Sequence, residues 1–222
     1  MKAMILAAGR GERMGELTRR CPKPLLPVAG KPLLQHHLER LQAAGFNQVV
    51  INASYLGEQI QQFVETHPLN MDIQLSMEAQ LLETGGGIFH ALPLLGEQPF
   101  VVINGDVWSD YPLAELAQKK LTAGSLAHVV LVENPAHNPQ GDFGLADGLL
   151  LNQPQYTFSG ISVISPGLFH GCSPGRFPLA PLLRAAANKS AITAEKYNGY
   201  WVDVGTPERL QQVEHSIQEH SE

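Results

Sequence analysis

A glycine-containing segment whose residues could bind a ligand follows the first apolar run of the chain. It reads Leu6-Ala7-Ala8-Gly9-Arg10-Gly11-Glu12-Arg13-Met14. Small residues let a ligand approach the backbone, consecutive amides in such a turn bind anions, and the guanidinium of Arg13 matches phosphate geometry. A surface turn shaped by glycine explains the segment equally well when it is taken alone. It is neither a dinucleotide fingerprint, which needs a third glycine at Met14, nor a P-loop, because no Gly-Lys-Ser/Thr follows.

Two further segments carry groups suited to phosphate or to a nucleotide base. Lys23 stands between Pro22 and Pro24, which stiffen the backbone around a point charge. An exposed lysine in a turn is the simpler interpretation of that segment alone. Residues 83–87 read Glu-Thr-Gly-Gly-Gly and open an expected helix, where three glycines are costly. Close contact with a base or phosphate would offset that cost, and so would a tight connection from strand to helix.

Two aspartates stand where strands are expected to end. Asp106 follows the buried run 99–104, and Asp203 lies in the sequence Trp-Val-Asp-Val-Gly at 201–205. Two carboxylates together with substrate phosphates and water are ligands that Mg²⁺ prefers. For either aspartate alone, a turn or capping role is the simpler interpretation. A glycosyltransferase with an Asp-x-Asp metal motif is disfavoured, because residues 104–108 contain one aspartate.

Alternating strands and helices are expected to position these segments. The hydrophobic periodicity predicts strands at 2–8, 48–53, 73–77, 99–104 and 127–133, and helices at 33–44, 57–66, 88–95 and 113–121. Pro93 leaves the end of the third helix open. The pattern predicts an α/β fold, with a mostly parallel mixed sheet flanked by helices and right-handed crossovers. Ligands bind at the carboxyl ends of the strands in such sheets.

The second half of the chain has a different pattern. It predicts a hairpin at Asp147-Gly148, strands at 157–164 and 200–204, a helix at 178–187, and a last helix that begins after Thr206. No linker or repeat interrupts the sequence. We expect one domain over 1–222, with a nucleotide-binding half at 1–133 and a completing half at 134–222.

The composition excludes several functional classes. Fifteen basic and 21 acidic residues give a net charge of −6, which disfavours nonspecific binding of nucleic acid. The two cysteines are far apart in the sequence, which disfavours a disulfide scaffold or a thiolate zinc site. No apolar run is long enough for a membrane span or a signal-peptide core. These features predict a cytoplasmic protein that acts on small molecules without a membrane or nucleic-acid partner. The oligomeric state stays open, and a monomer is compatible.

The motifs in their order resemble the sugar-1-phosphate nucleotidylyltransferases. Their signatures Leu-Ala-Ala-Gly-x-Gly-x-Arg-Met/Leu, Pro-Lys-Pro-Leu, Thr-Gly-Gly, Gly-Asp and Asp-x-Gly-Thr-Pro correspond to residues 6–14, 22–25, 84–86, 105–106 and 203–207. This resemblance spans nearly the whole chain. It implies a Rossmann-like nucleotidyltransferase fold with a small sugar-binding lobe. The implied reaction is Mg²⁺-dependent transfer of a nucleoside monophosphate to a sugar 1-phosphate, which releases pyrophosphate.

The resemblance also implies roles for individual residues, of which Arg13 and Lys23 would act in catalysis. The implied sites are Ala8, Gly9, Gly11, Glu12, Arg13 and Lys23 for the triphosphate and transferring phosphates, Glu78, Thr84 and Gly85 for the base, Asn104, Asp142, Gly144 and Ser159 for the sugar, and Asp106 and Asp203 for Mg²⁺. One departure concerns a Glu-Lys-Pro segment of many relatives, whose lysine touches the sugar phosphate. Residues 145–156 lack it, which leaves three alternatives: Lys189 substitutes, Lys196 substitutes, or no residue does.

The substrate pair is narrowed by the compact form of the chain. Its 222 residues are expected to leave no room for the left-handed β-helix domain of the acetylglucosamine-type or glucose-type enzymes. Within the family it most resembles enzymes of cell-wall sugar recycling that use UTP and N-acetylmuramic acid 1-phosphate. Guanylyl transfer to mannose or heptose 1-phosphate is the alternative. A non-catalytic nucleotide-sugar sensor is a second alternative, disfavoured because Arg13, Lys23 and both aspartates are present.

Overall fold

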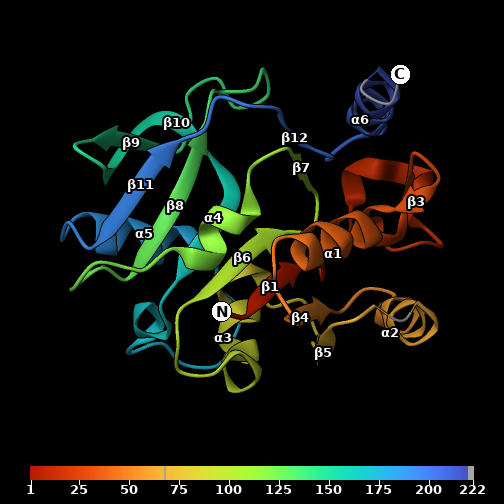
Figure 1. The fold of residues 1–222 in the computed structure, drawn as a ribbon, viewed down its shortest axis with the longest axis horizontal. Coiled ribbons are helices and arrows are strands. Elements are labelled where there is room, and N and C mark those ends of the chain that lie inside the picture. The colour runs from red at the N-terminus through yellow and green to blue at the C-terminus, as the bar shows by residue number, and fades with distance from the viewer. Residues whose placement is uncertain (68, 220–222) are drawn as a thin grey trace.

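The computed structural model describes residues 1–67 and 69–219 and is built around a mixed eight-stranded sheet (Figure 1). The strand order is β11-β8-β10-β6-β1-β4-β5, with β9 paired to β10. The strands are β1 (Ala3–Leu6), β4 (Gln48–Ala53), β5 (Asp72–Met77), β6 (Phe100–Asn104), β8 (Ala127–Val132), β9 (Phe143–Ala146), β10 (Leu149–Ile164) and β11 (Ile192–Lys196). Strands β1, β4, β5 and β6 are parallel, and β10 runs antiparallel to β6 and β8. The predicted α/β class with a mostly parallel mixed sheet is confirmed.

Helices cover both faces of this sheet and leave its strands buried. One face packs against α1 (Leu33–Ala43), α2 (Gly57–Thr66) and α4 (Leu113–Gln118), and the other against α3 (Glu83–Leu95) and α5 (Ala180–Ala187). Successive side chains of a strand alternate between the two cores, as Met4 and Ile5 of β1 do. Burial on both faces explains why the central strands are continuous apolar runs in the sequence.

The helix ends follow local rules, with one exception. Helix α1 ends just before Gly45, whose φ of +88° suits the left-handed position after a helix. Helix α3 continues through Pro93 to Leu95, so the proline does not end it. Pro93 lies in the last turn, where its missing N–H removes only one backbone hydrogen bond. No helix among the described residues has the length and apolar character needed to cross a membrane.

The second half of the chain joins the same sheet. Asp147 and Gly148 have φ of +51° and +73° and form the predicted two-residue hairpin between β9 and β10. Strand β10 is longer than the predicted strand at 157–164, and β11 was not predicted. Because β10 pairs with β6, the two halves 1–133 and 134–222 share one sheet.

A smaller set of elements closes the carboxyl edge of the sheet. Strand β7 (Val107–Ser109) pairs with β12 (Trp201–Asp203), and β2 (Pro27–Val28) pairs with β3 (Lys31–Pro32). Helix α6 (Pro207–Glu219) lies against the β2–β3 hairpin at the upper right of Figure 1. An apolar cluster of Val28, Leu33, Val202, Val204 and Val213 joins these pieces. Distant parts of the chain therefore meet beside the ends of β1 and β6.

Candidate active site

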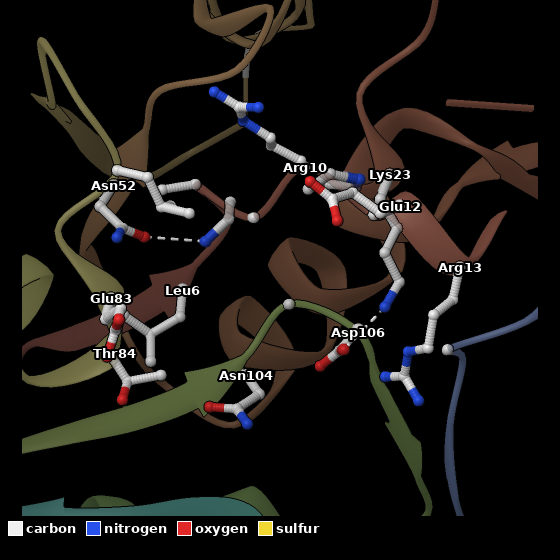
Figure 2. Close-up of a pocket in the computed structure, with 18 of the residues that line it drawn as sticks. Leu6, Arg10, Glu12, Arg13, Lys23, Asn52, Glu83, Thr84, Asn104 and Asp106 are labelled. Carbon is white, nitrogen blue, oxygen red and sulfur yellow. Dashed lines mark hydrogen bonds and ion pairs between the residues drawn. The ribbon is translucent and has the colours of Figure 1, made fainter. Parts of the chain in front are cut away.

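A cavity of about 650 Å³ lies at the carboxyl ends of β1 and β6 (Figure 2). This is the edge at which parallel α/β sheets bind ligands. The predicted site residues that line it are Ala8, Gly9, Gly11, Glu12, Arg13, Lys23, Thr84, Asn104 and Asp106. In Figure 2, Lys23, Arg13 and Asp106 lie at one end of the cavity, and Glu83 and Thr84 lie at the other. The structure thus brings the glycine segment, the lysine segment and one aspartate together.

The glycine segment after β1 owes its sequence to two different constraints. Gly11 has a φ of +64°, and a Cβ at this position would lie 3.0 Å from Cγ2 of Thr18 and 3.1 Å from Cβ of Lys23. This glycine is required by backbone conformation and by close packing against the lysine segment. At Gly9, in contrast, a Cβ would have no atom of the described residues within 4 Å. The backbone there is open to a ligand.

Lys23 forms an ion pair with Asp106 inside the cavity. Lys23 begins a short 3₁₀ helix, η2 (Lys23–Leu25), and is 9% exposed. The Nζ atom lies 2.7 Å from Oδ2 of Asp106, the contact drawn as a dashed line in Figure 2. The backbone of Asp106 is fixed in turn, because its carbonyl oxygen accepts a hydrogen bond of 2.7 Å from the Val204 amide. A rigid backbone therefore presents both charges.

Asp203 ends β12 in the β7–β12 ribbon, which Asp106 directly precedes. It pairs with Val107, the residue that follows Asp106. Its Oδ1 accepts a hydrogen bond from the Arg209 guanidinium and lies 3.1 Å from Nε2 of His137. Asp203 itself is not among the residues that line the cavity. Asp106 therefore directly precedes the ribbon that carries Asp203, while Asp203 is engaged by Arg209 and His137.

Arg209 and His137 are residues that the sequence analysis missed. Arg209 lies in the first turn of α6, where a positive charge opposes the helix dipole. A basic residue just after an expected helix start is visible in the sequence, so this signal could have marked Arg209 as a candidate functional residue. His137 lies on the loop between β8 and β9 and carries no comparable local signal.

Gly205 connects Arg209 to the cavity. A Cβ on Gly205 would collide with Nη2 of Arg209 and lie 2.9 Å from Nη2 of Arg13, so two guanidinium groups flank this glycine. Gly205 lines the cavity together with Arg13. No carboxylate in the described part of the chain lies within 4 Å of the Arg13 guanidinium. Arg13 therefore presents an uncompensated positive charge that suits an anionic ligand.

A histidine below the site contributes no charge at neutral pH. His37 of α1 is 2% exposed and interacts with the backbone of Gly105 and the charge of Asp106. Burial is the main reason that its pKa falls to about 4. The fixed positive charge beside Asp106 therefore comes from Lys23 and Arg13.

Glu78, predicted to lie near the base, stands behind the cavity wall. It is 6% exposed, and its Oε1 accepts a hydrogen bond of 2.6 Å from Nδ2 of Asn52. Its Oε2 accepts a hydrogen bond of 3.0 Å from the Leu82 amide. The Asn52 side chain also accepts one from the Ala7 amide, at 2.7 Å. Glu78 thus ties β4 to the start of α3, and both of its oxygens are engaged.

The three glycines of α3 are explained by packing against the protein itself. A Cβ on Gly85 would lie 2.6 Å from Cδ2 of Phe177, and one on Gly86 would collide with the carbonyl oxygen of Gly175. The Gly86 amide also donates a hydrogen bond of 2.9 Å to the carbonyl oxygen of Phe177. A Cβ on Gly87 would lie 2.6 Å from Oε1 of Glu78. Packing against residues 175–178 accounts for Gly85 and Gly86, and packing against Glu78 accounts for Gly87. Gly85 does not line the cavity, as a base-binding residue was expected to do.

Asn104 reaches the cavity from the end of β6, and Gly160 of β10 shapes its position. Gly160 has a φ of +79°, and a Cβ there would lie 2.6 Å from Nδ2 of Asn104.

Ser159, predicted to bind the sugar, is 1% exposed. Its hydroxyl donates to the Val130 carbonyl at 2.7 Å and accepts from the Ile161 amide at 3.1 Å. Ser159 therefore stabilises the irregular part of β10 and does not face the cavity.

The remaining sugar-site predictions also lie outside the cavity. Asp142 accepts a hydrogen bond of 2.9 Å from the Phe158 amide through its Oδ2. Gly144 faces Leu151 across the β9–β10 hairpin. Lys196 forms an ion pair with Glu133, and neither it nor Lys189 lines the cavity. Of the four predicted sugar residues, the cavity is lined by Asn104.

The position of Glu78 leads to a first prediction. Each carboxylate oxygen of Glu78 accepts one hydrogen bond, so in Glu78→Gln the new NH₂ group must face one of the two donors. The loss of that hydrogen bond costs about 1–3 kcal/mol of stability. We expect a lower melting temperature and an unchanged ratio of kcat/KM for UTP over GTP. The exposed Glu97→Gln is the matched control. A changed UTP/GTP ratio at unchanged stability would show that Glu78 reads the base.

Comparison with known proteins relates the whole chain to one enzyme family. The nucleotidyl transferase family model matches residues 2–148. An N-acetylmuramate alpha-1-phosphate uridylyltransferase from Neisseria meningitidis serogroup B is 47% identical over 228 residues, covering 96% of this chain and 97% of the relative. A protein of the same name from Caulobacter vibrioides is 35% identical over 225 residues, covering 93% and 92%.

A solved structure shares the fold at low sequence identity. A UDP-glucose pyrophosphorylase complexed with UDP-glucose superposes with a TM-score of 0.81 and 21% identity, covering 99% of this chain and 98% of that one. At this identity the likeness concerns the fold alone. The family match and the relative at 47% identity each extend over more than half of the sequence. The chain therefore belongs to the nucleotidyl transferase family.

Proposed function

We propose that this chain transfers UMP from UTP to N-acetylmuramic acid 1-phosphate, giving the UDP-sugar and pyrophosphate. The observation that carries the proposal is the cavity in which the open glycine turn, Arg13 and Lys23 converge beside Asp106. The named activity of relatives that match the chain over more than nine-tenths of its length supports this pair of substrates. The resemblance further suggests a cytoplasmic enzyme of cell-wall sugar recycling.

The chemistry of the two reactants explains why the cavity contains the positively charged side chains of Arg13 and Lys23. A phosphate monoester is mostly a dianion at pH 7, because its second pKa is about 6. Its oxygen attacks the α-phosphorus of UTP, the bond from that phosphorus to the bridging oxygen breaks, and pyrophosphate leaves with the electron pair. No proton has to be removed from the nucleophile. The main obstacle is repulsion between two polyanions, which Arg13 and Lys23 would reduce.

Asp106 and Asp203 are the residues that would hold Mg²⁺. Their donor set fits this ion, because both are hard carboxylate ligands, one at the end of β12 and one directly before its partner strand β7. The described residues contain no group of three or more His, Cys, Asp or Glu side chains arranged for a metal. Two carboxylates with phosphate oxygens and water are the ligand set that Mg²⁺ takes up in nucleotide sites. When bound, the ion would stabilise negative charge on the phosphates.

A substrate panel tests the proposed function. Purified protein with Mg²⁺ is mixed with UTP or GTP and with N-acetylmuramic acid, N-acetylglucosamine, glucose or mannose 1-phosphate, and pyrophosphate release is measured. We expect the highest kcat/KM for UTP with N-acetylmuramic acid 1-phosphate. A preference for GTP with mannose 1-phosphate would replace this pair by the guanylyltransferase alternative. Nucleotide binding without turnover on any pair would identify a sensor.

A further inference from the structure

Both carboxylates proposed as metal ligands are already paired with cations of the same chain. Lys23 Nζ lies 2.7 Å from Oδ2 of Asp106, with 11% and 32% of the two side chains exposed. Asp203 is held by Arg209, whose side chain is 15% exposed, and by His137. These contacts are distinct from surface ion pairs such as that of Lys31 with Glu39, whose side chains are 48% and 36% exposed.

A divalent ion on either oxygen of Asp106 would be close to the Lys23 ammonium, and an ion on Oδ2 would compete with it for that oxygen. Mg²⁺ binds carboxylates at about 2.0–2.1 Å, so an ion on Oδ2 of Asp106 would lie close to Nζ in its present position. Like charges at such a separation repel strongly in a partly buried site. The Lys23 ammonium must therefore move away from Asp106, or the ion must bind weakly.

The surroundings of Lys23 allow the side chain to move while its backbone stays. Pro22 and Pro24 flank the residue, and its Cβ packs where Gly11 leaves room. The flexible end of the side chain faces the cavity lined by the glycine turn, where the triphosphate is proposed to bind. A phosphate there offers Nζ a second anionic partner of higher charge than Asp106.

We propose that Lys23 blocks the metal ligand Asp106 until a nucleotide triphosphate draws its ammonium away, so that the divalent ion and the nucleotide bind cooperatively. This inference rests on the proposed function and adds to it a reason for joint binding of metal and nucleotide. The linkage is reciprocal: the nucleotide raises affinity for the ion by the same factor by which the ion raises affinity for the nucleotide. Arg209 on Asp203 opposes the ion in the same way at the second carboxylate.

The test measures binding of Mn²⁺, an octahedral oxygen-binding substitute for Mg²⁺, by electron paramagnetic resonance without nucleotide. We expect Lys23→Met to bind Mn²⁺ about tenfold more tightly than the wild type, within the usual range of coupling between sites. The α,β-methylene analogue of UTP should tighten Mn²⁺ binding in the wild type and much less in the variant. Arg10→Met is the matched control, because Arg10 lines the same cavity and has no carboxylate within 4 Å among the described residues.

The outcomes separate direct competition from a general loss of positive charge. Equal gains in Lys23→Met and Arg10→Met, or no gain in Lys23→Met, would overturn the proposal. The double variant Lys23→Met with Asp106→Asn is expected to lose the gain, and a gain that persists would also overturn it. Failure of the proposed function would show separately, as wild-type protein that releases no pyrophosphate with any substrate pair, and the Mn²⁺ comparison would still be readable.

Discussion

Asp106→Asn is expected to lower kcat for pyrophosphate release at least about 100-fold, a loss of roughly 3 kcal/mol of transition-state stabilisation. The change removes one negative charge and one hard oxygen ligand while it preserves the shape of the side chain. The Asp106 backbone is held by the Val204 amide, so the loop should keep its conformation. Steady-state kinetics with saturating UTP and sugar phosphate, over a range of Mg²⁺ concentrations, measures the effect.

A matched variant distinguishes this loss from a general effect of charge. Asp147→Asn alters the exposed β9–β10 hairpin, where a φ of +51° is compatible with asparagine. It should keep wild-type kcat. Thermal unfolding of Asp106→Asn checks that the fold survives. A folded Asp106→Asn enzyme with wild-type kcat at ordinary Mg²⁺ concentrations would remove the metal role assigned to this residue.

Arg13→Ala is expected to lower kcat/KM for UTP by about 10²–10³-fold, since a single group that stabilises charge in the transition state contributes that much. The guanidinium reaches Gly205 at the cavity wall and has no carboxylate within 4 Å in the described residues. Its charge is therefore available to the phosphates. Arg13→Lys should recover only part of the loss, because an ammonium lacks the paired donors of a guanidinium.

Arg19→Ala is the control for Arg13. Arg19 follows the same 3₁₀ segment, η1 (Glu12–Thr18), and pairs with Glu16 at the surface, where both side chains are more than 70% exposed. Pyrophosphate release should stay within about twofold of wild type, as expected for an exposed ion pair. An Arg13→Ala enzyme as active as this control would show that Arg13 does not act on the triphosphate.

The nucleotide-binding edge of the fold could be predicted because its signals are local. Buried apolar runs mark β1, β4 and β6, and glycine, proline and charged residues mark the loops that follow them. Parallel strands end at one edge of a sheet, so the glycine turn and Asp106 had to meet. The alternation in sequence was therefore enough to place Arg13 and Asp106 near one another, while the place of Lys23 was implied by the resemblance of its Pro-Lys-Pro-Leu segment.

The sugar-side residues could not be predicted in the same way, because their neighbours are distant in the sequence. Ser159 bonds to Val130, 29 positions away, and Asp142 bonds to Phe158, 16 positions away. Register shifts in β10 decide which of these side chains face inward. Neither the register nor the irregularity is visible in hydrophobic periodicity.

The glycines of α3 show a second limit. A run of glycines indicates that another group packs closely against the backbone, but it does not identify that group. For Gly86 it is the segment that contains Gly175 and Phe177, about 90 positions further along the chain. A bound ligand and a second backbone segment both require glycine at the point of contact, so the sequence does not distinguish them.

A crystal structure with Mg²⁺, the α,β-methylene analogue of UTP and N-acetylmuramic acid 1-phosphate would show whether the cavity binds both reactants and the ion. We expect both phosphorylated molecules in the cavity beside Gly9 and Gly11, with Arg13 and Lys23 on phosphate oxygens. We also expect one ion shared by Asp106, Asp203 and the nucleotide. Nucleotide bound away from the glycine turn, or carboxylates at 106 and 203 that hold no common ion, would contradict these expectations.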